Sequence, residues 1–185
     1  LPATPDGWGT LICQPGEGPF PALARALAPE IEGDAEALSK LVNFETNAPQ
    51  LFARWRYRHE QALLIVDQFE ELFTQNPPGV QAGFAVLLRK LVDTCDVHVL
   101  LSMRDDFLYR CHEQEPLAPI FSGLVPVRVP AHGDLHRALV EPAARFGYAF
   151  EDDGLVGEML DAVAGERGAL PLLAFAVERL WVHRD

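Results

Sequence analysis

Three carboxylates in this sequence follow an apolar run closely enough to act together on a bound phosphate group. Residues 62–66 are unbroken apolar and rich in branched side chains, which predicts a strand buried on both faces of a parallel sheet. Asp67 ends this run, so we expect its carboxylate at the carboxyl end of a strand, where it could bind Mg²⁺. If a helix begins at once, Glu70, Glu71 and Thr74 share the side of Asp67. Either glutamate could then be the general base for an attacking water, or both could lie on an ordinary solvated helix face.

A second apolar run, residues 97–101, is followed by two further candidates. Arg104 carries a guanidinium group, which matches phosphate oxygens bidentately and could stabilise or sense a γ-phosphoryl group. Ser102 could help to orient water. The alternative for Arg104 is a salt bridge to Asp105 or Asp106, which follow it directly.

These candidates need a sheet to position them, and the chain alternates between strand and helix patterns. Strands are expected at residues 8–13, 62–66, 97–101 and 124–129. Helices are expected from residues 19–21 onward, after Asp34, and at 48–59, 79–93 and 105–121. This alternation predicts an α/β fold with a doubly wound parallel sheet and right-handed crossovers.

The strand signals stop after Pro130, and only helical patterns follow. Helices are expected at residues 134–146, kinked or restarted at Pro142 and closed by Gly147, and at 152–163 and 171–182. We therefore predict an α/β core over residues 1–130 and a small all-helical subdomain over residues 131–185.

The composition excludes several classes of protein. A formal net charge of −12 over 185 residues opposes binding to a phosphodiester backbone, so direct contact with nucleic acid is not expected. No run approaches the roughly 18 consecutive apolar residues of a membrane-spanning helix, and no signal-peptide pattern occurs. The three cysteines lack the spacing of a zinc site or a disulfide scaffold, which predicts a reducing cytoplasm.

The run from residue 63 to residue 74 resembles the Walker B region of the bacterial novel STAND NTPases, an apolar strand followed by Asp-Gln-Phe-Glu-Glu-Leu-Phe-Thr. Residues 100–108 resemble the next strand of that family, which ends in a small hydroxyl residue, any residue and Arg, and continues into Asp-Phe-Leu. Residues 139–143 and 168–176 resemble its helical subdomain. The resemblance covers nearly the whole chain.

This resemblance implies a P-loop NTPase-like fold that uses Mg²⁺ and ATP, and it matches Asp67 to the Walker B acid and Ser102 and Arg104 to the hydroxyl residue and the arginine that end the next strand. It places Pro171, in a Gly-x-Pro-like element, near the adenine, although a proline is also common in the first turn of a helix. It implies a signalling switch with sensor and effector domains elsewhere in the full-length protein. ATP or GTP as the nucleotide, and the oligomeric state, stay open.

The sequence departs from the family in one respect, because no Gly-x-x-x-x-Gly-Lys-Ser/Thr phosphate loop occurs in it. Residues 14–19 contain glycine, but their acid and prolines fit a turn better than a phosphate cradle. The first strand and phosphate loop are thus expected in a preceding segment of a longer protein, or the chain is a degenerate copy. This segment alone is expected to bind nucleotide weakly or not at all.

Two other classes of protein are alternatives to a switch NTPase. A catalytically inactive α/β interaction module that keeps the fold for docking or assembly is the main alternative, and the missing loop favours it. An α/β hydrolase would need a Gly-x-Ser-x-Gly nucleophile elbow, which does not occur.

Overall fold

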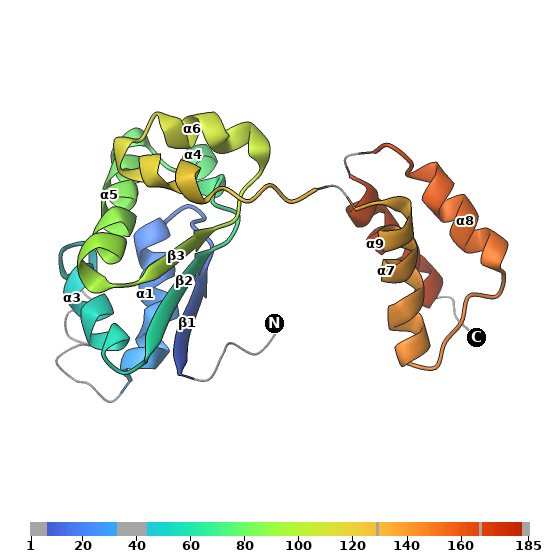
Figure 1. Ribbon diagram of the computed structural model, residues 1–185, viewed down its shortest axis with the longest axis horizontal. Coiled ribbons are helices and arrows are strands. Elements are labelled where there is room, and N and C mark those ends of the chain that lie inside the picture. The colour runs from blue at the N-terminus through green and yellow to red at the C-terminus, as the bar shows by residue number, and fades with distance from the viewer. Residues whose placement is uncertain (1–6, 33–43, 129, 167, 183–185) are drawn as a thin grey trace. The chain divides into compact units, whose positions relative to one another are not determined.

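The computed structural model describes residues 7–32, 44–128, 130–166 and 168–182. The contacts divide the chain into two compact units, Leu1–Leu124 and Val125–Asp185 (Figure 1). Each unit has its own hydrophobic core. No described helix is both long enough and apolar enough to cross a membrane.

The first unit is built on a parallel sheet of three strands, β1 (Trp8–Cys13), β2 (Gln61–Val66) and β3 (His98–Leu101), in the order β1-β2-β3. The register aligns Cys13 with Val66, and Val66 with Leu101. All three strands lie within a residue of their predicted positions, and the α/β class with a parallel sheet is confirmed.

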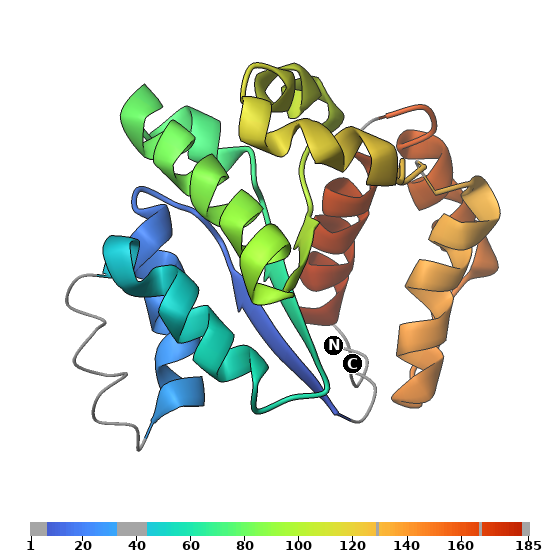
Figure 2. The same cartoon turned by 60° about the vertical axis from the view of Figure 1, so that its left-hand side comes forward.

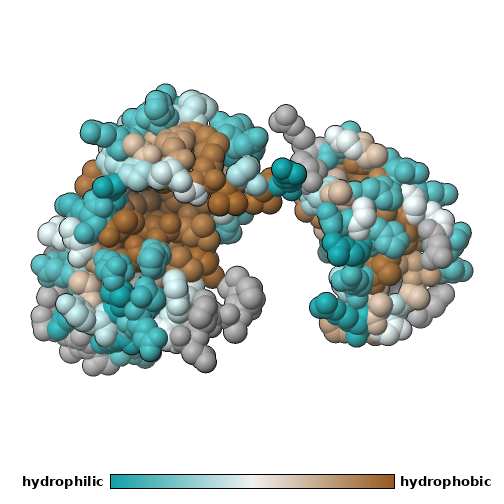
Figure 3. All heavy atoms as spheres, viewed as in Figure 1, coloured by the Kyte–Doolittle hydropathy of each residue, from teal (hydrophilic) through white to brown (hydrophobic). Residues whose placement is uncertain are grey.

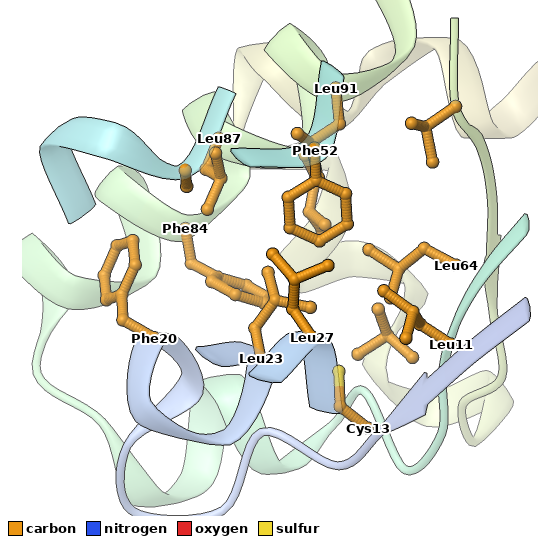
Figure 4. Packing of buried hydrophobic residues seen from close by; sticks show 14 of the residues in the cluster. Leu11, Cys13, Phe20, Leu23, Leu27, Phe52, Leu64, Phe84, Leu87 and Leu91 are labelled. Carbon is orange, nitrogen blue, oxygen red and sulfur yellow. The ribbon is translucent and has the colours of Figure 1, made fainter. Parts of the chain in front are cut away.

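Three helices cover one face of this sheet: α1 (Pro19–Leu27), α3 (Phe44–Arg56) and α5 (Pro78–Cys95) (Figure 2). Alternate strand residues, such as Leu64 and Val66, point into the core and are fully buried. Figure 4 labels ten side chains of this core: Leu11, Cys13, Phe20, Leu23, Leu27, Phe52, Leu64, Phe84, Leu87 and Leu91. Burial of these apolar groups is the main stabilising contribution to the unit.

The opposite face of the sheet differs from the prediction. Leu63 and Ile65 of β2 are only half-buried, while Ile12 and Leu100 are 40% and 53% exposed. Hydrophobic residues are visible on this side of the first unit in Figure 3. Among the described residues, helices of the first unit therefore cover one face of the sheet, and the second helical layer expected of a doubly wound sheet is not seen there. The complete burial of β2 predicted from its apolar run is not found, because an uncovered face of such a strand carries the same residue types.

Short helical turns make up the rest of the first unit: η1 (Ala28–Ile31), α4 (Glu71–Gln75), η3 (Asp105–Phe107), α6 (Leu108–His112) and η4 (Glu115–Gly123). The helical stretch predicted at 105–121 is thus confirmed as a series of short turns. The helix expected after Asp34 lies outside the described residues.

The strand predicted at 124–129 does not form over its described residues 124–128, which have no regular structure and are exposed throughout. A strand needs a neighbour with which its backbone N–H and C=O groups can pair. None of the described residues pairs with this segment, so its apolar, branched composition was not sufficient to make it a strand.

The second unit contains three helices, α7 (His132–Arg145), α8 (Asp153–Ala162) and α9 (Ala169–Val182), as predicted. Pro142 lies inside α7 without ending it, and Gly147 follows the helix with a φ of +78°. The Asp152 carboxylate accepts a 2.8 Å hydrogen bond from the Gly154 N–H and caps α8. The three helices pack around a small core: Leu135, Leu139, Val156, Leu160, Val163, Ala169 and Leu173.

One-sided packing of the sheet predicts that two leucines on neighbouring strands contribute very unequally to stability. Leu64→Ala leaves a cavity in the covered core and should lower the free energy of unfolding by about 2–5 kcal/mol. Leu100→Ala, on the open face, should cost less than about 1 kcal/mol. Urea unfolding of this chain followed by circular dichroism measures both, and equal losses would contradict the one-sided core.

Candidate functional site

The carboxyl ends of the three strands bring three polar residues into one row. Gln14, Asp67 and Ser102 directly follow β1, β2 and β3, and the register places them side by side. The backbone pairing continues one residue beyond the strands, because the Asp67 N–H donates to the Cys13 carbonyl at 2.9 Å and the Ser102 N–H to the Val66 carbonyl at 3.0 Å. In parallel α/β sheets this edge is where ligands bind.

Asp67 lies at the centre of this row, and each of its carboxylate oxygens accepts a hydrogen bond from a neutral donor. The Ser102 hydroxyl donates to Oδ1, and the Gln14 amide donates to Oδ2 at 3.4 Å. The hydrogen bond from Ser102 is the main cause that lowers the pKa of Asp67 below its ordinary value. Burial opposes it, and smaller contributions from Gln14 and from the Gln68 backbone act in the same direction as Ser102. The carboxylate is therefore ionised at neutral pH.

Sequence reasoning selected Asp67 and Ser102 but missed Gln14. Residues 14–19 were interpreted only as a turn because of their glycines and prolines. A signal was nevertheless present, since Gln14 follows its strand directly, as Asp67 and Ser102 follow theirs. Aligning the ends of the three predicted strands would have placed all three side chains together.

The helix expected directly after Asp67 begins later than predicted. A turn separates β2 from α4, with Gln68 at a φ of +52°, and the Phe69 N–H donates to the Ser102 carbonyl at 2.9 Å. Phe69 is fully buried, and this anchors the turn. The expected helical side shared by Asp67, Glu70, Glu71 and Thr74 is therefore wrong, because only residues from Glu71 onward are helical.

The two glutamates that sequence reasoning could not separate have different surroundings. One carboxylate oxygen of Glu71 accepts a 3.0 Å hydrogen bond from the Gly16 N–H, in the loop between β1 and α1. The Oε2 atom of Glu70 is buried and accepts no hydrogen bond from the described residues. Leaving a buried acceptor without a hydrogen-bond donor costs free energy, so such an atom needs an explanation. One common explanation is that the group acts on a ligand or a water molecule.

Arg104 is engaged locally. Its guanidinium donates to both carboxylate oxygens of Asp106, at 3.1 and 2.8 Å, and lies 5.7 Å from the centre of the Phe107 ring. This is the salt bridge that sequence reasoning kept as the alternative role. The pair is exposed, with 67% of the Arg104 side chain accessible, so its net contribution to stability is small.

Pro171 belongs to the second unit, where it is exposed in the first turn of α9. The same unit contains a pocket of about 400 Å³ whose apolar lining includes Leu135, Leu160, Val163 and Ala169. His132 and Glu166 also line this pocket, whereas Pro171 does not.

Mg²⁺ would find a suitable but incomplete set of ligands in the first unit. Asp67 supplies an ionised carboxylate and Ser102 a hydroxyl oxygen, both hard donors of the kind that Mg²⁺ prefers. Across the described part of the chain, no group of three or more His, Cys, Asp or Glu side chains could enclose a metal ion. This fits an ion that is held by one or two carboxylates, with nucleotide phosphates and water as its other ligands.

Comparison with protein families matches residues 2–185 of the chain to the family described as Novel STAND NTPase 1. The match spans nearly the whole sequence, including the residues that follow all three strands and the helices of the second unit. No curated protein and no solved structure gives a match to the chain.

The hydrogen bond between Ser102 and Asp67 predicts a pH-dependent effect of Ser102→Ala. Because the pKa of Asp67 is lowered in the folded state, its ionisation stabilises the fold above the unfolded-state pKa, about 3.9, and this stabilisation is lost as the pH falls through the folded-state pKa. Ser102→Ala should therefore be less stable than the unmodified chain at pH 7, and the difference should narrow below about pH 4.

Urea unfolding at a series of pH values measures this difference. Ser102→Thr keeps the hydroxyl and is the matched control, with a pH profile close to that of the unmodified chain. A difference between Ser102→Ala and the unmodified chain that is the same at every pH would show that the hydrogen bond does not act through the Asp67 carboxylate.

Proposed function

Because the chain belongs to the novel STAND NTPase 1 family, we propose that it forms the nucleotide-binding and helical portion of a signalling NTPase that works as a regulatory switch. The observation that carries this proposal is the ionised Asp67 at the carboxyl ends of three parallel strands, with Ser102 hydrogen-bonded to it. Mg²⁺ and ATP are the proposed ligands. Hydrolysis of the γ-phosphate would then change the state of the switch.

Asp67 and Ser102 are proposed to hold Mg²⁺ and the water around it. When bound, the ion would neutralise charge on the nucleotide phosphates. The strand β2 fixes the backbone of Asp67, and the Ser102 hydroxyl fixes its side chain. A preorganised carboxylate of this kind loses little conformational freedom on binding.

Glu70 is the better candidate for the general base. Its Oε2 atom is buried and has no hydrogen-bond donor among the described residues, so a donor is expected from bound water, from a ligand or from a segment that completes the site. Glu71 is already occupied by the Gly16 N–H. The different contacts of the two side chains support this choice, which their spacing alone did not allow.

Arg104 is proposed to respond to the γ-phosphate by exchanging partners. Its bidentate contact with Asp106 uses the same guanidinium geometry that phosphate oxygens would use. Because that ion pair is exposed and weak, a phosphate nearby could compete with it. Arg104 would then report whether the nucleotide carries its terminal phosphate.

The phosphate loop is proposed to come from a segment outside this sequence, on a strand that joins the same sheet. Two observations support this: the apolar face that the described helices leave uncovered, and the lack, among the described residues, of a pairing partner for the strand-like residues 124–128. A further strand could supply a backbone pairing partner for residues 124–128, and its helix would bury the apolar surface of the uncovered sheet face.

Residues 131–185 are proposed to form a helical lid. Residues 1–130 are proposed to form the α/β core on which this lid acts. The resemblance assigns Pro171 to the neighbourhood of the adenine. The apolar pocket beside the start of α9 offers a surface of suitable chemistry for a flat base. Sensor and effector domains would be covalently linked parts of the full-length protein or separate partners.

A catalytically inactive interaction module is the second candidate. The observations that favour it are the missing phosphate-loop motif in this sequence and the contact of Arg104 with Asp106 rather than with the row at Asp67. In that case the polar row would be a remnant that stabilises the sheet edge. The two candidates differ in whether the full-length protein binds Mg·ATP through Asp67.

Calorimetric titration of the full-length protein with Mg·ATP tests the proposal. Asp67→Ala should weaken binding at least about tenfold, since it removes the charged metal ligand. Arg104→Ala should weaken ATP more than ADP, because only ATP carries the γ-phosphate. Equal affinity in all three proteins would contradict the assignment, and no binding in any would favour the inactive module.

Steady-state hydrolysis by the full-length protein separates the two glutamates. Glu70→Gln should lower kcat by about 10²–10⁴-fold, as expected for loss of a general base. Glu71→Gln keeps an oxygen that can accept from Gly16, and is the matched control with kcat close to that of the unmodified protein. The reverse order would make Glu71 the base.

A further inference from the structure

Gln14 is the third member of the polar row, and the proposed chemistry gives it no role. Its amide donates to the carboxylate oxygen of Asp67 that Ser102 does not contact. The two donors thus approach Asp67 from the strands on either side of β2. Two neutral donors restrict rotation of a carboxylate without cancelling its charge, which keeps it able to attract a cation.

The position of Gln14 depends on the loop between β1 and α1, residues 14–18. One end of this loop is fixed by the sheet, where the Cys13 carbonyl accepts from the Asp67 N–H. Two residues beyond Gln14, the backbone of Gly16 is held on both sides. Its N–H donates to Glu71 at 3.0 Å, and its carbonyl accepts from the Asn76 amide at 2.7 Å. Gly16 has a φ of +53°, a conformation that glycine adopts without strain.

The residues that hold this loop are themselves fixed. Asn76 is 9% exposed, and its side-chain amide also donates to the Glu71 backbone carbonyl at 3.3 Å. The backbone carbonyl of Asn76 accepts from the Gln81 side-chain amide at 2.7 Å. Glu71 begins α4, which follows the turn after Asp67. The contact with Gly16 therefore connects two neighbouring loops at the same edge of the sheet.

We propose that Gln14 is a positioning residue for Asp67, and that Glu71 and Asn76 hold the loop that presents it. This inference rests on the proposed function only where it takes Asp67 as the metal ligand. The contacts among the four residues can be tested without nucleotide. Glu71 then acts through the loop and takes no part in proton transfer, which is consistent with Glu70 as the base.

The direct readout is the pKa of Asp67. It is measured by ¹³C NMR of the Asp67 carboxyl carbon during a pH titration of this chain. Gln14→Ala removes one donor and should raise the pKa of Asp67. Glu71→Ala releases Gly16 and should raise this pKa relative to Glu71→Gln. Glu71→Gln is the matched control, because it removes the same negative charge but keeps an oxygen that can accept from Gly16.

The comparison of the two Glu71 variants separates the effect of releasing the loop from the effect of removing the Glu71 charge. Loss of a nearby negative charge would by itself lower the pKa of Asp67, equally in both variants. The proposal therefore expects a higher pKa in Glu71→Ala than in Glu71→Gln, and no further rise when Gln14→Ala is added to Glu71→Ala.

Equal pKa values in the two Glu71 variants would overturn the role of Glu71. An unchanged pKa in Gln14→Ala would overturn that of Gln14. In the full-length protein, Gln14→Ala should weaken Mg·ATP binding by about threefold to tenfold, as for the loss of one hydrogen bond to a charged group. If no variant binds nucleotide while the pKa values change as expected, the contacts stand and the proposed function fails.

Discussion

The in-register pairing of three parallel strands is the constraint on which the candidate site depends. Backbone hydrogen bonds join Cys13 to Asp67 and Val66 to Ser102, so the three strands end at the same level of the sheet. A shift of one residue in either pairing would separate Asp67 from one of its two donors and turn the apolar residues of the shifted strand away from the core. The same register thus buries Leu64 and Val66 and assembles the polar row.

Packing on the covered face is what maintains this register. The helices α1, α3 and α5 bury alternate residues of the strands, and this stabilisation fixes which side each residue faces. The opposite face receives no such cover from the described residues of the first unit. A site built at the edge of a half-covered sheet gains rigidity from one side only. In our account, the hydrogen bonds of Ser102, Gln14 and Glu71 add local rigidity where packing does not reach.

The sequence allowed much of this arrangement to be predicted. Strand and helix periodicity located all three strands, and the abrupt change from Val66 to Asp67 marked the centre of the row. Residues 124–128 were predicted wrongly because strand propensity describes composition, whereas a strand also requires a partner. The different contacts of Glu70 and Glu71 were beyond prediction, since they depend on how the turn after β2 and the loop before α1 meet in space. Gln14 was missed because its loop was interpreted through its glycines and prolines alone.

The central claim is that Asp67 holds the metal ion of a bound nucleotide. The most direct measurement is a crystal structure of the full-length protein with Mg²⁺ and a non-hydrolysable ATP analogue. Our account predicts the ion at the Asp67 carboxylate, either at about 2.1 Å or through one bridging water molecule, beside the Ser102 hydroxyl. A metal ion and nucleotide bound elsewhere, with the row of Gln14, Asp67 and Ser102 unchanged and untouched, would contradict it.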